Sequence, residues 1–309
     1  VEATGSSSLS DCIACAAGTF AEATGSDQAS DCIDCAAGTY VDVTGSDESS
    51  DCLSCVAGRY VEVTGSDESA DCIDCAAGMF VSVSGSDQAS DCRVCAAGTF
   101  VEATGSDDAA DCIQCAAGTY AEAAGNDEAD DCIDCEAGRF SSTVGSFSVF
   151  DCIACRRGTY APGAGNDAEG DCILCGTGKF STVVGSVFGG DCIDCAAGTY
   201  VSTEGNSEAA NCISCAAGSL QISPGSASCT ACSAGQYSDT RSTGCTACAA
   251  GWADLDSNPS TPCIQCAEGH YSAGLATSCT TCARGTADLD GDAATACVDC
   301  EVGFYAPEA

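Results

Sequence analysis

The sequence predicts an elongated, β-poor rod of small disulfide-rich repeats with little regular secondary structure. Every cysteine of the 309-residue chain belongs to a C-x-x-C pair, and these pairs recur at a nearly constant interval. Large apolar residues are scarce, with 9 Phe, 8 Tyr, 1 Trp and 1 Met beside 32 Cys. A chain of this composition cannot build one large hydrophobic core, so we expect covalent cross-links to hold many small ones.

Internal repetition sets the organisation of the chain. The first cysteines of the pairs fall every 20 residues from Cys12 to Cys212, and later spacings lie between 16 and 18. We interpret residues 1–228 as a regular array and residues 229–309 as a shorter-period variant. A weaker 40-residue rhythm in the turns favours a module of about 40 residues with two C-x-x-C pairs. Both ends fall within a repeat, so we expect a segment of a longer protein.

Each repeat contains the same elements in the same order. A Gly follows every second cysteine by three residues, beginning with Gly18, and this predicts a positive φ or a close backbone approach. Two residues later an aromatic residue recurs, which we expect to pack against a disulfide and to supply most of the small core. The Val/Thr-rich run Tyr60–Thr64 predicts a strand, and the turn Gly65–Asp67 follows it.

An Asp precedes the first cysteine of most repeats, as Asp31 does before Cys32. This position suits an Asx-turn, in which the carboxylate accepts a backbone N–H of the C-x-x-C turn. Calcium ligation is the alternative, because carboxylate oxygens are the ligands that Ca²⁺ prefers.

Disulfides and zinc compete for the cysteines. The spacing C-x2-C-x16-C-x2-C fits a zinc ribbon. However, four thiolates leave a net charge of about −2 on each Zn²⁺ site, and the chain already carries −38. We therefore expect all 32 cysteines to be oxidised.

Two connectivities satisfy the spacing. Crossed pairing within two-pair modules closes every bond without leaving a cysteine over, and it is the one we predict. Serial pairing, Cys15–Cys32 and then Cys35–Cys52, leaves one cysteine open at each end, and geometry permits either scheme. The predicted crossed bonds begin Cys12–Cys32, Cys15–Cys35, Cys52–Cys72 and Cys55–Cys75.

The charge balance excludes several classes of partner. The chain carries 46 acidic residues against 8 basic ones, and such a surface repels nucleic acid and anionic membranes. It favours solubility, basic partners and divalent cations. No apolar run approaches the roughly 20 residues that span a bilayer, so we expect no membrane span in this segment.

Catalysis finds no support, and calcium is the one candidate cofactor. The single histidine, His270, stands in an aromatic position with no nucleophile motif around it, so we expect no enzyme. Alternate acids recur in two loops, which we interpret as ordinary acidic turns. The alternative is two calcium sites, although the twelve-residue loop with its terminal Glu is incomplete. The candidate ligands are Asp254, Asp256, Asp288, Asp290 and Asp292.

Apolar residues replace the acidic turns between Cys132 and Cys195, and basic residues gather in the same stretch. Because strong like charge opposes association elsewhere, we predict that this stripe docks against another copy or another subunit. Basic side chains would then meet acidic turns of the partner. The alternative is that the apolar side chains cover their own Gly-rich modules. The candidate residues are Phe147, Val149, Phe150, Val187, Phe188, Arg156, Arg157 and Lys179.

The stretch Cys32–Tyr40 shows the repeat as C-x-x-C-x-x-G-x-[YF]. This pattern resembles the ephrin-receptor-like cysteine-rich repeat, which is similar in style to tumour-necrosis-factor-receptor and EGF-like modules. The resemblance covers essentially the whole chain. Its Ala-rich, acidic style resembles algal and protist surface proteins, among them mastigoneme-type flagellar hairs.

The resemblance implies an extracellular or cell-surface location and a structural subunit of a filament or surface appendage. Its partners would be other copies of the chain or other filament subunits. The alternative function is a cell-surface receptor, an adhesion stalk or a cysteine-rich variant surface antigen. No N-x-S/T sequon is present, so any glycan would be O-linked, on Ser and Thr residues of the turns, and the sequence does not determine whether one is attached.

Overall fold

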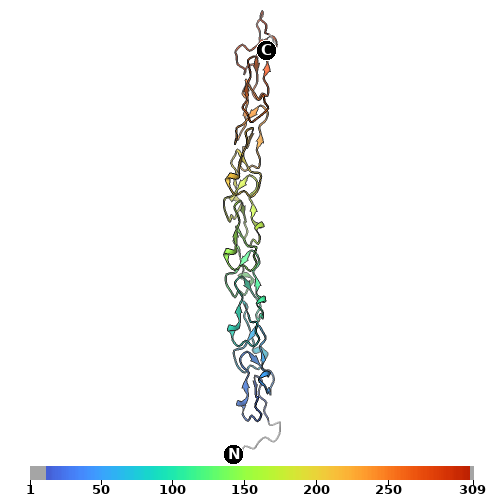
Figure 1. Ribbon diagram of the computed structural model, residues 1–309, viewed down its shortest axis with the longest axis vertical. Coiled ribbons are helices and arrows are strands. Elements are labelled where there is room, and N and C mark those ends of the chain that lie inside the picture. The colour runs from blue at the N-terminus through green and yellow to red at the C-terminus, as the bar shows by residue number, and fades with distance from the viewer. Residues whose placement is uncertain (1–11, 307–309) are drawn as a thin grey trace, which may run out of the picture. The chain divides into compact units, whose positions relative to one another are not determined.

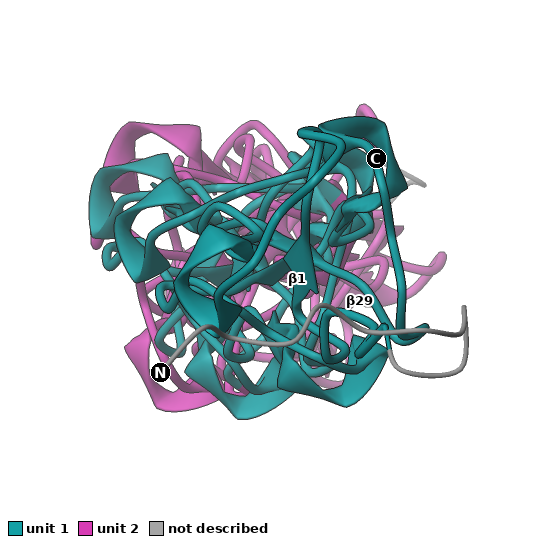
Figure 2. Ribbon diagram, turned by 90° about the horizontal axis from the view of Figure 1, so that it is seen from below, with its two compact units in different colours: residues 1–153, 164–169 teal, residues 154–163, 170–309 magenta. Residues whose placement is uncertain are grey.

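The structure, a computed structural model, describes residues 12–306 and divides the chain into two compact units, which Figure 2 colours separately. Unit 1 comprises residues 1–153 and 164–169, and unit 2 comprises residues 154–163 and 170–309. Each unit consists of two-residue strands that pair as small antiparallel hairpins in chain order (Figure 1). Residues 12–306 contain no α-helix and no sheet of more than two strands. The predicted fold class of disulfide-rich tandem repeats is therefore confirmed.

Each odd-numbered strand within a unit pairs with the strand that follows it. The strands of unit 1 are β1 Thr19–Phe20, β2 Ile33–Asp34, β3 Thr39–Tyr40, β4 Leu53–Ser54, β5 Arg59–Tyr60, β6 Ile73–Asp74, β7 Met79–Phe80, β8 Arg93–Val94, β9 Thr99–Phe100, β10 Ile113–Gln114, β11 Thr119–Tyr120, β12 Ile133–Asp134 and β13 Arg139–Phe140. Strand β14, Ile153–Ala154, lies at the division between the units. The strands of unit 2 are β15 Thr159–Tyr160, β16 Ile173–Leu174, β17 Lys179–Phe180, β18 Ile193–Asp194, β19 Thr199–Tyr200, β20 Ile213–Ser214, β21 Ser219–Leu220, β22 Thr230–Ala231, β23 Gln236–Tyr237, β24 Thr246–Ala247, β25 Trp252–Ala253, β26 Ile264–Gln265, β27 His270–Tyr271, β28 Thr280–Thr281, β29 Thr286–Ala287 and β30 Val298–Asp299.

One-turn 3-10 helices precede the cysteine pairs of the regular array. They are η2 Ala29–Asp31, η3 Ser49–Asp51, η4 Ser69–Asp71, η5 Ala89–Asp91, η6 Ala109–Asp111, η7 Ala129–Asp131, η8 Val149–Asp151, η9 Glu169–Asp171, η10 Gly189–Asp191 and η11 Ala209–Asn211. None of these helices is long or apolar enough to cross a bilayer.

In most hairpins of the regular array an aromatic residue faces a β-branched or other aliphatic residue, whereas in the β7–β8 hairpin Phe80 faces Arg93. In the β5–β6 hairpin Tyr60 is opposite Ile73, and such cross-strand pairs stabilise two-stranded sheets. The predicted strand Tyr60–Thr64 was placed too late, because β5 ends at Tyr60. Val61 instead bonds to neighbouring repeats: its N–H donates to the Ser86 carbonyl at 3.2 Å, and its carbonyl accepts from Gly38 at 2.8 Å.

Each repeat contacts the next two repeats through its backbone. Gly18 donates to the Val41 carbonyl at 2.8 Å in the following repeat, and Gly45 donates to the Cys15 carbonyl at 2.8 Å. Gly18 also lies against the repeat after that, since a Cβ built on it would stand 2.2 Å from the Gly65 carbonyl oxygen. Its φ of 85° confirms the prediction of a positive φ and a close approach.

The disulfides are serial, so the predicted crossed pairing is wrong. Cys15 bonds to Cys32, Cys35 to Cys52 and Cys55 to Cys72, and the predicted partners Cys12–Cys32 and Cys15–Cys35 are not joined. The pattern continues through fifteen bonds, ending with Cys282–Cys297. The physical reason is strand geometry: Ile33–Asp34 between the two cysteines form the extended strand β2, so side chains three positions apart point to opposite faces. Cys32 therefore bonds back to Cys15, whereas Cys35 packs with Phe20 and Val41 beside its own partner Cys52.

Two cysteines differ from the expectation of full oxidation, because Cys12 and Cys300 are unpaired in the structure. The repeating unit also differs from the predicted two-pair module. The bond from Gly18 to Val41 recurs identically from Gly38 to Val61, so the contacts repeat every 20 residues.

The cores are small and lie between successive disulfides. Phe20 packs with Cys35 and Val41, and Cys52 lies against them. Tyr40 packs in the same way on the cluster of the next disulfide, Cys55–Cys72. The predicted contact between the aromatic residue and a disulfide is therefore confirmed, and it falls on the disulfide of the following pair.

The Asp before each cysteine pair has a local backbone partner, but in the opposite direction from the one predicted. Asp71 Oδ2 accepts the N–H groups of Asp67 at 3.0 Å and Glu68 at 3.3 Å, both upstream. The carboxylate thereby caps η4 rather than the C-x-x-C turn.

Candidate interaction surfaces and cation sites

The apolar turn Phe147–Phe150 is built on the same scaffold as the acidic turns. Asp151 Oδ2 accepts the N–H groups of Phe147 and Ser148, each at 3.1 Å. The acidic turn one repeat earlier is held in the same way, with Asp127 donating to Asp131 at 3.1 Å. The turn therefore keeps its backbone and changes only the side chains that it presents.

The side chains that replace the acids in this turn stay on the surface. Phe147 is 61% exposed and Phe150 is 89% exposed. Val149 is half-buried, and its N–H donates to Glu122 Oε1 at 3.3 Å. These two phenylalanines do not fold back over their own module, so an apolar surface is present in unit 1.

The turn at Val187 and Phe188 in unit 2 is only partly exposed. Phe188 lies against Gly190, where an added Cβ would stand 2.2 Å from the ring atom Cε2. Val187 and Phe188 keep 45% and 55% of their surface exposed. Local packing therefore accounts for part of this turn. Because the two turns belong to different units, their union in one stripe stays a prediction.

Most of the basic residues predicted to meet a partner are already engaged within the chain. Lys179 Nζ lies 2.6 Å from Asp194 Oδ1, its cross-strand neighbour in the β17–β18 hairpin. Arg139 Nη1 donates to the Cys152 carbonyl at 2.8 Å, and Arg156 also has a partner. Arg157 is exposed. Sequence reasoning missed the Lys179–Asp194 pair because the two residues are 15 positions apart and meet only through the hairpin register.

The predicted calcium residues act as hydrogen-bond acceptors of their own loops. Asp256 accepts from Thr261 Oγ1 at 2.9 Å and from the N–H of Asn258 at 3.0 Å, and Asp254 Oδ1 accepts the same N–H at 3.1 Å. The Thr261 hydroxyl first, and then the Asn258 N–H, hold the pKa of Asp256 below its usual value.

The second loop repeats this arrangement. Asp290 accepts from the N–H of Asp292 at 3.1 Å and from Thr295 Oγ1 at 3.0 Å, and these bonds, the Asp292 N–H first, lower its pKa. Asp288 accepts from the N–H of Gly291 at 2.9 Å. Residues 12–306 gather no group of three or more His, Cys, Asp or Glu side chains that could hold a metal ion. Backbone N–H groups and Thr hydroxyls donate to the carboxylates of both loops, as expected for ordinary acidic turns.

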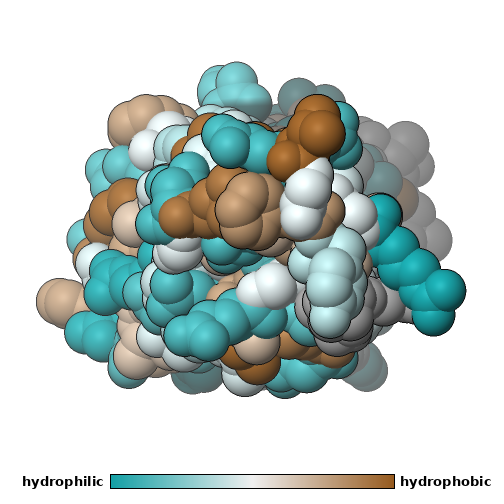
Figure 3. All heavy atoms as spheres, turned by 90° about the horizontal axis from the view of Figure 1, so that it is seen from above, coloured by the Kyte–Doolittle hydropathy of each residue, from teal (hydrophilic) through white to brown (hydrophobic). Residues whose placement is uncertain are grey.

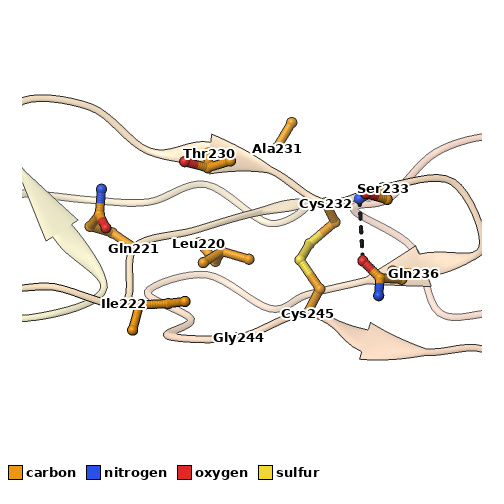
Figure 4. Close-up of a pocket in the computed structure, with 10 residues that line it drawn as sticks. All are labelled: Leu220, Gln221, Ile222, Thr230, Ala231, Cys232, Ser233, Gln236, Gly244 and Cys245. Carbon is orange, nitrogen blue, oxygen red and sulfur yellow. Dashed lines mark hydrogen bonds between the residues drawn. A yellow bond between two sulfur atoms is a disulfide. The ribbon is translucent and has the colours of Figure 1, made fainter.

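The described residues form only shallow grooves. One groove of about 410 Å³ lies beside the Cys232–Cys245 disulfide, where Leu220 occupies the position of the aromatic residue (Figure 4). Its lining residues include Gln221, Ile222 and Gln236, and none carries a charge. The smaller Leu220 leaves this space open, and the groove offers no acid, base or metal ligand.

A second groove, of about 460 Å³, lies in unit 1 and is acidic. Glu102, Asp127, Glu128 and Asp130 line it together with two alanines. Glu102 Oε1 accepts the N–H of Ala129 at 3.4 Å, so this carboxylate caps η7. On the face that Figure 3 shows, apolar and polar side chains are interspersed.

Comparison with known families agrees with the repeat geometry. The family model for "Tyrosine-protein kinase ephrin type A/B receptor-like" sequences matches residues 4–52, 23–72 and 98–152. Over these stretches the chain is similar to ephrin-receptor-like cysteine-rich repeats, which are non-catalytic modules. The serial disulfides of the matched stretches continue through the rest of the described chain. No curated protein matches the chain.

The repeats and the disulfides together indicate a secreted or extracellular protein. Fifteen disulfides persist only where the surroundings are oxidising.

Proposed function

We propose that this chain is a structural subunit of an extracellular filament or cell-surface appendage of the mastigoneme type. The observation that supports this proposal is the interlocking of each repeat with the next two, as Gly18 does with Val41 and Gly65. Within each unit, repeats bonded in this way form a quasi-one-dimensional array rather than separate binding domains. The shallow, uncharged groove at Leu220 agrees with a role in spacing and support rather than in chemistry.

Association with a second copy is the second part of the proposal. A net charge of −38 opposes contact between copies over most of the surface. The turn bearing Phe147 and Phe150 removes the acids at one position and offers exposed aromatic surface instead. We place the contact between copies at this turn, with the Val187–Phe188 turn as a second contact. Arg157 is the exposed basic residue available to acidic turns of the partner.

A cell-surface receptor, adhesion stalk or variant surface antigen is the alternative function, favoured by the receptor-like family match. In that case the chain would remain monomeric and the exposed turn would bind a different protein. O-linked glycans on exposed turn residues such as Ser49 and Ser69 would fit either function.

Sedimentation and negative-stain microscopy of the oxidised chain test the proposal. We expect fibres or concentration-dependent oligomers, and we expect the variant Phe147→Ser/Phe150→Ser to lose them. The matched control is Asp127→Ser/Asp130→Ser, which alters the same two positions of the neighbouring acidic turn and should keep or strengthen association. A chain that stays monomeric at all concentrations would favour the alternative function, and equal assembly of both variants would exclude this turn as the contact.

A further inference from the structure

The serial disulfides create a short covalent route along the chain. In each C-x-x-C pair between the first and the last, the first cysteine bonds backward and the second bonds forward: Cys32 is joined to Cys15, and Cys35 is joined to Cys52. A pulling force applied to the two ends can therefore pass from Cys15 to Cys32, along three residues to Cys35, and on to Cys52. The residues between Cys35 and Cys52 lie outside this route, in a loop that the Cys35–Cys52 disulfide closes.

The lengths of the two routes differ several-fold. One disulfide spans 5.7 Å between the Cα atoms of Cys35 and Cys52, and three residue steps add about 10 Å when fully extended. We call each disulfide a staple and the covalent route through the disulfides the stapled route. Through one repeat this route is therefore about 16 Å long at full stretch. A 20-residue repeat without its disulfide would reach about 70 Å.

The stapled route has little slack even in the folded state. Ile33–Asp34, the two residues between Cys32 and Cys35, form strand β2, and Cys32 itself is extended with φ −75° and ψ 121°. A strand already rises about 3.3 Å per residue, which is close to the maximum for a chain. Breaking the hydrogen bonds of a repeat would thus lengthen the route by much less than 16 Å.

The hydrogen bonds that join neighbouring repeats arise from the closed loops. Gly18 lies in the loop closed by Cys15–Cys32 and donates to Val41, which lies in the loop closed by Cys35–Cys52. These contacts set the packing of the repeats, while covalent bonds alone set their greatest separation. The cysteines take part in both, since the Cys15 carbonyl accepts from Gly45, but only their disulfides limit the separation.

We infer that this chain serves as a tension-bearing tether whose extension is capped by its disulfides. This function goes beyond the proposed filament role, because it belongs to the single chain and requires no assembly. Any surface structure exposed to pulling or shear would keep its reach nearly constant as long as the staples are closed. Loss of one staple of the regular array would release a fixed length of about 55 Å, from 17 residues of loop less the span of the bond.

Single-molecule stretching of the oxidised chain, held by handles at its two ends, tests the inference. We expect the wild-type chain to lengthen by less than about 16 Å per repeat at any force that leaves covalent bonds intact. The variant Cys75→Ala/Cys92→Ala removes one staple and should add about 55 Å to the final length. The matched control, Cys12→Ala, removes an unpaired cysteine and should add nothing.

A second measurement needs no variant. When the wild-type chain is held at constant force and a phosphine reductant is added, each disulfide takes up two electrons and two protons while the phosphine becomes its oxide. The chain should then lengthen in separate steps of about 55 Å for bonds of the regular array. Oxidised extension of about 70 Å per repeat, or no added length in the Cys75→Ala/Cys92→Ala variant, would overturn the inference. Both readouts are taken on single molecules, so a failure to form filaments would leave them unaffected.

Discussion

The regular array and the shorter-period region form the same turn with different residues. In the array a Gly at positive φ donates to the cysteine carbonyl of the preceding repeat, as Gly65 does to Cys35 at 2.8 Å. After Cys215 the corresponding bonds come from Arg241, to Cys215 at 2.8 Å, and Leu275, to Cys248 at 2.9 Å, with φ values of 61° and 64°. The backbone path is thus retained where the residue best suited to it is lost.

The shorter repeats also lack one element of the regular repeats. Within residues 12–306 the 3-10 helices end with η11, and the loop within a disulfide falls from 17 residues to between 13 and 15. Shortening therefore deletes the capped helix and leaves the hairpin and the staple. The hairpin and the disulfide form the essential part of the repeat, and the capped helix is an addition to it.

Filling the close approach between alternate repeats should have the largest effect. In Gly58→Ala the new Cβ would stand 2.1 Å from the Gly105 carbonyl oxygen, at a φ of 86°. We expect destabilisation of more than about 3 kcal/mol, from backbone strain and overpacking together. Gly285→Ala in the shorter-period region has a φ of 84° with nothing within 4 Å, so it should cost only about 1 kcal/mol. Denaturant unfolding under non-reducing conditions measures both, and equal losses would show that the contact carries no weight.

Removing a staple should affect the two regions almost equally. Cys115→Ala/Cys132→Ala opens a 17-residue loop and Cys232→Ala/Cys245→Ala a 13-residue loop. Loop entropy depends on the logarithm of length, so each variant should lose about 3 kcal/mol. A much larger loss in the regular array, measured by the same unfolding experiment, would mean that the capped helix depends on its disulfide.

Restoring Gly in the shorter-period region should give a smaller effect of opposite sign. Leu275→Gly relieves a left-handed conformation at a side chain that is 53% exposed. We expect a gain of about 0.5–1 kcal/mol. The reciprocal change, Gly125→Leu in the regular array, should destabilise, because Gly125 has a φ of 77°. Thermal melting of the two variants checks this, and a loss in Leu275→Gly would show that the leucine side chain contributes packing.

Acidification should weaken the shorter-period loops at low pH. The pKa values of Asp256 and Asp290 are lowered from 3.8 by their hydrogen bonds, so the charged forms favour the folded loops. This contribution is complete above pH 3.8 and is lost as the pH falls through the lower folded pKa values. Carboxyl-carbon NMR titration should give midpoints below 3.8, and Thr261→Val should raise that of Asp256. An unchanged midpoint in Thr261→Val would contradict the assigned cause.

Residue spacing predicted the repeat, the glycine geometry and the packing of the aromatic residue, because each depends on a local pattern. The constant position of Gly18 within the repeat predicted its positive φ, and the constant position of Phe20 predicted that its ring lies in the core. The connectivity was not predictable, because Cys32 and Cys35 are three residues apart and loops to either have similar closure cost. Contacts 47 residues apart, such as Gly18 with Gly65, leave no trace in a 20-residue period.

The candidate sites show the same contrast between features that a local pattern predicts and features that it leaves open. The exposure of Phe147 and Phe150 was predictable, because their positions hold acids or small polar and apolar residues in most other repeats. The role of Asp254 and Asp256 was ambiguous in sequence, since alternating acids suit both a cation and a chain of backbone donors. In the structure Asn258 and Thr261 donate to these carboxylates, which supports the acidic turn and leaves the calcium site a prediction.

The direction of the disulfides also bears on how the protein is made. After Cys12, the first cysteine of each pair bonds to a residue nearer the N-terminus, as Cys52 does to Cys35 and Cys72 to Cys55. During vectorial synthesis into an oxidising compartment, every arriving cysteine of this kind therefore finds its partner already present. Oxidation can advance behind the emerging chain one hairpin at a time, and, apart from Cys12, at most one thiol of the finished portion awaits a partner. Crossed pairs would instead leave two free thiols at every step. Each arriving cysteine would then have two competing partners, and one of the two bonds would be incorrect.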